Sequence, residues 1–416
     1  MTINHGIETE DLIEKICSKM FFADFTVRDL KFKSESGYVK EAADLFVIYD
    51  ETLIAFQIKS KIETKPASLK DKKDFQRIDK RINDALGQFN TTKNVLNRGL
   101  LSTLKTVKGY SIDFDSSKIT KIIGIIIINL KGEEEFDKDE RTVIAYGFTI
   151  MYEMPIHIFR FDEFNIISKE VDTMPDFLNY LNVREKLISN KQLISYKSEL
   201  DFLALFKTKY DQLEKALEDR NVNIVLLPHL WEESRIQYSD AIKRRDEENQ
   251  YSYLIDEIIN FLHTSVGFTL DDEYDKNGQG SIESYLEIAR ELARTPRIVR
   301  RQLGKILYEK TIKAIANRIG YSVIYDEINK SGIFLLSYCG TRHERRDLLN
   351  KYCILAYCAY DMKKITGICT EPANHIYRSY DAVLYQNVEF EKQEELKLEG
   401  LKLFKPGVHT RIDEYS

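Results

Sequence analysis

Apolar and polar positions alternate with two different periods along the chain, and the changes between them predict where helices and strands lie. Apolar residues at three- and four-residue spacing predict helices over residues 8–22 and 71–96. The almost continuous β-branched run 119–130 predicts a strand that is buried on both faces. Further strands are expected at 142–150 and 156–161, followed by a helix that has Thr173 as its N-cap. The sequence therefore predicts an α/β region that is rich in strands.

The pattern changes to mainly helical near residue 190 and alternates again after residue 295. Helical composition covers 191–220, and helices are expected at 251–265, 281–294, 299–317 and 343–360. Strands are expected at 321–325, 332–338, 365–370 and 382–386. This pattern predicts three parts, which are an N-terminal domain over 1–190, a helical connecting region over 191–295, and a second small α/β domain over 296–416.

The stretch 41–59 is typical of a β-hairpin that carries polar side chains on one face. If the turn centres on Asp50 and Glu51, the numbers of paired residues sum to 101, so Asp44 faces Gln57. Opposed residues have Cβ atoms about 5 Å apart. The Asp44 carboxylate and the Gln57 carbonyl are then placed to share a hard cation such as Mg²⁺, and Lys59 points to the same side.

Asp44 followed by Gln57-Ile58-Lys59 resembles the active-site signature of the PD-(D/E)xK nuclease superfamily, in the Q-x-K variant of Mrr-like and NERD-like restriction endonucleases. Residues 8–130 also follow the order of elements in these nucleases, which is helix, three-stranded meander, helix and strand. The resemblance implies a restriction-endonuclease-like N-terminal domain, with a mixed central sheet flanked by helices. It also implies a Mg²⁺- or Mn²⁺-dependent DNA endonuclease of a prokaryotic defence system against foreign DNA.

The resemblance also assigns roles to individual residues. Asp44 and Gln57 would hold the metal ion, and Lys59 would position the attacking water or stabilise charge on the phosphate. Members of this superfamily often supply one more carboxylate from the first helix, and Glu10 lies at the edge of its apolar stripe, with Glu14 as the alternative. Acidic residues at a helix N-terminus also complement the helix dipole, so a purely structural role stays open for both.

A basic segment follows the motif. Residues 59–81 hold nine basic and four acidic residues, a local charge of +5 on a chain whose formal net charge is −6. Such a patch is suited to DNA phosphates. The expected contact residues are Lys61, Lys70, Lys72, Lys73 and Arg77. The alternative is a solvated helix face that carries charges of both signs.

Two features leave alternatives open. Glutamine is a neutral and weaker metal ligand than glutamate, so the chain is alternatively a catalytically inactive module for nucleic-acid binding or assembly on a nuclease-like scaffold. In the C-terminal domain, the tract Thr341–Arg346 predicts either an anion site at a helix N-terminus or only a charged first turn. A role in sensing, binding or assembly is expected for this domain, with a second copy of the chain or a defence-system protein as its partner.

Bulk features predict a cytoplasmic protein that does not cross a membrane. The first 20 residues contain Glu8, Glu10 and Asp11, which an apolar signal sequence does not tolerate. The run 119–130 is too short to span a bilayer. The five cysteines form no C-x-x-C pair, which favours reduced thiols over a zinc site.

Overall fold

A computed structural model of the whole chain describes residues 5–33, 37–61, 72–130, 147–194, 198–262, 282–376 and 378–404. The protein is a mixed α/β protein, and it divides into two compact units, Met1–Ile242 and Lys243–Ser416. The boundary expected at residue 190 falls inside the first unit. The three-part division by role stays a prediction.

The first unit is built on a six-stranded mixed sheet with the order β1-β2-β3-β6-β8-β7. Strands β3, β6 and β8 run parallel, and the pairs β1–β2, β2–β3 and β7–β8 are antiparallel. As predicted, β6 is buried on both faces, because consecutive residues such as Ile126 and Ile127 are fully buried. The strands are β1 (Thr26–Lys33), β2 (Val39–Tyr49), β3 (Thr52–Lys61), β6 (Lys121–Leu130), β7 (Phe148–Met151) and β8 (Met154–Arg160), and the small pair is β4 (Thr103–Lys105) and β5 (Ser111–Asp113).

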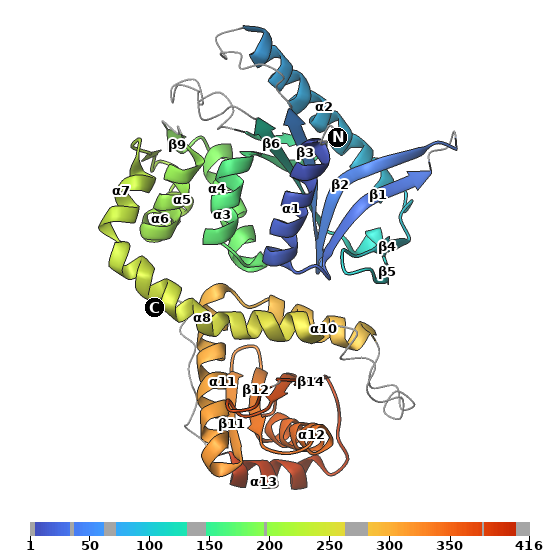
Figure 1. Cartoon of the computed structure of the whole chain (residues 1–416), viewed down its shortest axis with the longest axis vertical. Coiled ribbons are helices and arrows are strands. Elements are labelled where there is room, and N and C mark those ends of the chain that lie inside the picture. The colour runs from blue at the N-terminus through green and yellow to red at the C-terminus, as the bar shows by residue number, and fades with distance from the viewer. Residues whose placement is uncertain are drawn as a thin grey trace. The chain divides into compact units, whose positions relative to one another are not determined.

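Helices cover both faces of this sheet (Figure 1). Helix α2 (Lys72–Asn97) lies on one face, where its Phe89 belongs to the same hydrophobic cluster as Phe46 of β2 and Ala55 of β3. The neighbouring residue Phe56 points to the other face and meets Phe164 of α3 (Phe161–Glu170) edge to face, with ring centroids 6.0 Å apart. Helix α1 (His5–Phe21) contacts α3 and therefore covers that second face.

Short helices complete the first unit. Helix α4 begins after Thr173, whose side chain accepts a hydrogen bond from the Asp176 amide, as the sequence predicts. The helical composition of 191–220 resolves into two helices, because the chain leaves the helical conformation at Lys209. The remaining elements are α4 (Met174–Ser189), β9 (Leu193–Ile194), α5 (Glu199–Thr208), α6 (Tyr210–Glu218), β10 (Ile224–Val225) and α7 (Leu230–Gln237).

A buried polar network joins the sheet to α4 and α5. Arg184 of α4 is fully buried and donates from Nε to both carboxylate oxygens of Glu199 on α5, at 3.0 Å each. Its Nη1 lies 3.0 Å from Nδ1 of His157 on β8, and the Tyr180 hydroxyl also donates to Glu199. Burial and the neighbouring Arg184 guanidinium hold the pKa of His157 well below its usual value. The network therefore links α5 to α4 and to β8 within the first unit.

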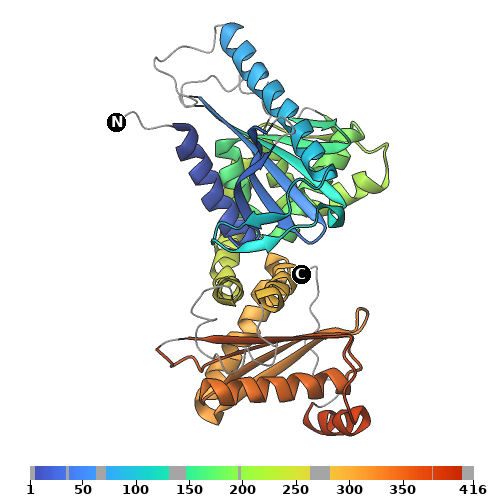
Figure 2. The same cartoon turned by 90° about the vertical axis from the view of Figure 1, so that its right-hand side faces the viewer.

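The second unit is built on a four-stranded sheet with the order β11-β12-β13-β14. Strands β12 and β13 are parallel, and both outer pairs are antiparallel. Figure 2 shows α12 and α13 on one face of this sheet. The expected elements are present, but the helix expected at 251–265 begins at Ser239, its expected positions 263–265 lie outside the described residues, and α13 was not expected. They are α8 (Ser239–Leu262), α10 (Ile282–Ala293), α11 (Arg297–Asn317), β11 (Ile319–Asp326), β12 (Ser331–Tyr338), α12 (Arg342–Ala359), β13 (Lys364–Thr370), β14 (Tyr380–Gln386) and α13 (Gln393–Leu403).

None of the helices in the described part of the chain combines the length and the apolar character that crossing a bilayer requires.

Candidate active site

The β2–β3 hairpin has the register that the sequence predicts. Its pairs run from Tyr49–Thr52 to Leu45–Phe56, so the numbers of paired residues sum to 101. The turn residue Asp50 adopts a left-handed conformation with φ 51°, which is typical of tight hairpin turns. The ladder pairs end one position before Asp44. The hairpin therefore opens at the position where the motif residues begin.

Asp44 reaches across this opening to β3. Its Oδ2 accepts a hydrogen bond from the backbone N–H of Ile58 at 2.5 Å, and Ile58 lies between Gln57 and Lys59. Gln57 is only 2% exposed, and Lys59 is partly exposed. The Lys59 ammonium donates a hydrogen bond to Gln57 Oε1 at 3.2 Å. The structure therefore links Asp44 to the backbone between Gln57 and Lys59, and it links the side chains of Lys59 and Gln57 to each other.

A residue that the sequence analysis missed completes this arrangement. The Lys59 ammonium also donates to Gln88 Oε1 of α2 at 2.7 Å, so two amide oxygens hold it in place. Gln88 belongs to a stripe of α2 that faces the opened hairpin. In this stripe Arg81 donates to a backbone carbonyl of β3, and Thr92 donates to one of β2. Polar residues at helical spacing beside the apolar stripe are the signal that points to Gln88.

Glu10 lies apart from these three residues. It is on α1, which covers the opposite face of the sheet, and its Oε2 is 3.4 Å from Arg28 Nη2. Arg28 also pairs with the alternative carboxylate, Glu14, at 2.9 Å. The amide of Asn129 on β6 donates to the Thr9 hydroxyl at 2.9 Å, so this part of α1 is at the same end of the sheet as the site. The roles of Glu10 and Glu14 as metal ligands stay predictions.

The donors at this site are of the type that binds hard cations. The Asp44 carboxylate and the Gln57 amide provide oxygen atoms, which Mg²⁺ and Mn²⁺ prefer. Among the residues with described positions, no group of three or more His, Cys, Asp and Glu side chains is arranged to hold a metal ion. Asp44 and Gln57 therefore fit Mg²⁺ by donor type, whereas the third expected ligand, Glu10, is engaged by Arg28.

The predicted DNA-contacting residues cannot be placed at the site. Lys70 lies outside the described residues, and the side chains of Lys61, Lys72, Lys73 and Arg77 do as well. Their contact with DNA stays a prediction.

Comparisons with models of known families, with curated proteins and with solved structures found no match to this chain. The function must therefore be inferred from the motif and from the geometry around Lys59.

Proposed function

We propose that this protein is a metal-dependent DNA endonuclease that hydrolyses phosphodiester bonds. The proposal depends on one observation, which is that Asp44 bonds to the backbone of the Gln57–Lys59 segment where the β2–β3 hairpin opens, beside the contact of Lys59 with Gln57. Apart from the small pair β4–β5, the element order is α1, β1, β2, β3, α2, β6, with β6 parallel to β3, and this order supports a restriction-endonuclease-like fold for the first unit. A role in cytoplasmic defence against foreign DNA follows from the motif resemblance alone.

The residues of this site would have separate roles in the reaction. The Asp44 carboxylate and the Gln57 amide oxygen would hold Mg²⁺, which supplies positive charge beside the scissile phosphate. Lys59 would donate a hydrogen bond to a phosphate oxygen or to the attacking water, and so stabilise the charge that develops in the transition state. Gln88 holds the ammonium through its amide oxygen, which fixes its direction before DNA arrives.

Gln57→Glu tests whether position 57 is inside the metal site. We expect the variant to bind Mg²⁺ at least as tightly as the wild-type chain, because it adds a formal charge to an oxygen ligand. Cleavage activity can change in either direction. Metal affinity is read from the increase in melting temperature with Mg²⁺ concentration, since an ion that binds only the native state stabilises it. Loss of this increase would contradict the expected ligand role of position 57.

The basic segment is tested by charge reversal of Lys70, Lys72 and Lys73 to Glu. If all three contact phosphates, DNA affinity falls for every sequence, and the log–log salt dependence becomes shallower by about 0.9 per lost contact. Fluorescence anisotropy with labelled DNA at several salt concentrations measures both effects. An unchanged slope together with unchanged cleavage would assign DNA binding to another surface.

The side-chain contacts of two predicted metal ligands favour a second candidate function. Gln57 Oε1 accepts from Lys59, and the Glu10 carboxylate is paired with Arg28. Of the three predicted metal ligands, Asp44 is then the only one that provides a carboxylate at the opened hairpin. A catalytically inactive module that binds nucleic acid or assembles with partners is therefore the alternative. It predicts DNA binding without Mg²⁺-dependent cleavage.

A further inference from the structure

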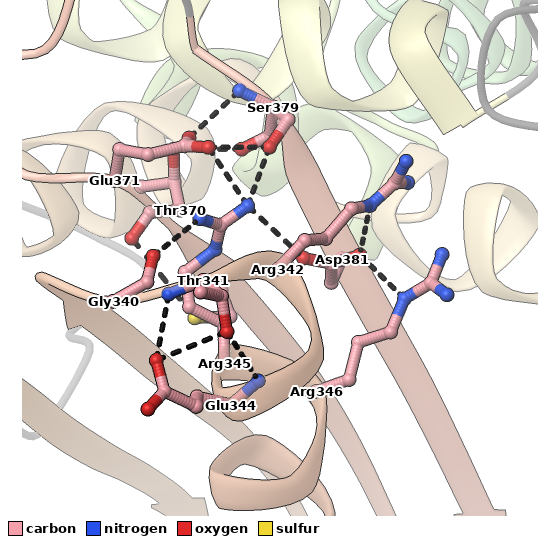
Figure 3. Close-up of polar contacts among 11 residues, drawn as sticks. Gly340, Thr341, Arg342, Glu344, Arg345, Arg346, Thr370, Glu371, Ser379 and Asp381 are labelled. Atoms are coloured by element: carbon pink, nitrogen blue, oxygen red, sulfur yellow. Dashed lines mark hydrogen bonds and ion pairs between the residues drawn. The ribbon is translucent and has the colours of Figure 1, made fainter. Parts of the chain in front are cut away.

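Three arginines at the start of α12 surround two buried acids in the second unit (Figure 3). Arg345 is 3% exposed, and its Nη2 lies 2.7 Å from Glu371 Oε1. On the other side of this cluster, Asp381 Oδ1 accepts from Arg342 Nε at 3.0 Å and from Arg346 Nε at 2.8 Å. One carboxylate oxygen therefore holds two guanidinium groups side by side.

The terminal nitrogens of this arginine pair are turned outward. Figure 3 shows the Nη groups of Arg342 and Arg346 on the side away from the Asp381 carboxylate. The two side chains are 22% and 17% exposed, whereas Asp381 is 3% exposed, so the pair forms the rim of a buried cluster. Guanidinium groups present their N–H donors in a planar fork that matches the oxygens of a phosphate group.

The position in the fold also matches the place where open α/β sheets commonly bind ligands. The parallel strands β12 and β13 both end at this edge, and ligands of open α/β sheets bind outside the carboxyl ends of such strands. The first turn of α12 is already capped, because Thr341 and Glu344 bond to each other's backbone amides. The guanidinium groups, rather than helix amides, are therefore the donors at this edge.

We propose that Arg342 binds a phosphate group, with Asp381, Arg345 and Arg346 as positioning residues. This site goes beyond the proposed nuclease function, because it is in the second unit and uses none of the residues around Lys59. A nucleotide and a nucleic-acid backbone present the same phosphate chemistry, and the experiment separates these two sources.

The test is a calorimetric titration of the full chain in EDTA at constant ionic strength. The probes are inorganic phosphate, 5′-AMP, and a twelve-nucleotide oligothymidine without terminal phosphates. We expect Arg342→Gln to weaken phosphate binding by about tenfold or more, because charged hydrogen bonds are lost. Arg342→Lys keeps the charge but loses the fork, so it should weaken binding as well. Lys351→Gln on the same helix, where Lys351 is 60% exposed, is the control and should bind like the wild type.

Each outcome either tests the phosphate site or identifies the source of the phosphate. Arg342-dependent binding of phosphate and 5′-AMP supports it with a nucleotide as the source. Arg342-dependent binding of the oligonucleotide alone supports it with a nucleic-acid backbone as the source, since binding at the Lys59 site does not depend on Arg342. Equal titrations for the wild type and both Arg342 variants, or no binding by the wild type, would overturn it. Circular dichroism confirms that each variant is folded.

Discussion

Replacing Lys59 by alanine is expected to lower the rate of DNA cleavage by about a hundredfold or more, to the limit of detection. The reason is that Lys59 would be the cationic donor beside the phosphate, and removing one such preorganised donor typically costs that much. Stability should change by only about 0.5 kcal/mol, because the Lys59 side chain is partly exposed, so water can replace its ammonium beside the Gln57 and Gln88 amide oxygens. Cleavage of plasmid DNA and urea denaturation measure the two effects.

The control for this change is Lys121→Ala. Lys121 is an exposed lysine at the opposite end of the same sheet, where it pairs with Thr52 at the start of β3. The Lys121→Ala variant should cleave DNA at the wild-type rate. This result would exclude a general effect of removing a positive charge from the sheet. A folded Lys59→Ala variant that cleaves as fast as Lys121→Ala would contradict the assigned role of Lys59.

Replacing Arg184 by leucine in the buried network of α4 and α5 is expected to lower the stability of the first unit strongly. This change leaves the Glu199 carboxylate, which is 1% exposed, without its cation. Removing one partner of a buried ion pair typically costs about 3–5 kcal/mol, because the remaining charge stays buried and uncompensated. Urea denaturation followed by fluorescence of Trp231, the single tryptophan of the chain, reports on the first unit.

A double variant separates the lost ion pair from lost packing. Arg184→Leu combined with Glu199→Leu removes both charges, so it should recover a large part of the lost stability. A loss below about 1 kcal/mol for Arg184→Leu would mean that the network does not hold α4 and α5 together as the contacts indicate.

The hairpin was predictable because local rules determine it. A period of two and a polar turn at Asp50 and Glu51 set the register, and the register brings Asp44 to the Gln57–Lys59 segment. Gln88 was not predictable in the same way. It lies 29 residues after Lys59, and its contact depends on how α2 is rotated on the sheet, which the apolar stripe fixes only approximately.

The contacts of Glu10 and of the arginine pair were not predictable from the sequence for a similar reason. The helical pattern relates Glu10 to the apolar stripe of its own helix, but it does not say which face of the sheet that helix covers. The sequence likewise shows the tract Thr341–Arg346, but Asp381, which holds Arg342 and Arg346, follows them by 39 and 35 residues. Such pairings depend on strand order, which residue patterns alone do not specify.

Nicking of a supercoiled plasmid is the most direct test of the central proposal. The wild-type chain and Lys59→Ala are each incubated with the plasmid in Mg²⁺ and in EDTA. We expect the wild type to nick the plasmid in Mg²⁺ and not in EDTA, and Lys59→Ala to leave it intact in both. Absence of nicking by a folded wild-type chain that binds DNA, or equal nicking by Lys59→Ala, would contradict the assignment of a metal-dependent endonuclease to this site.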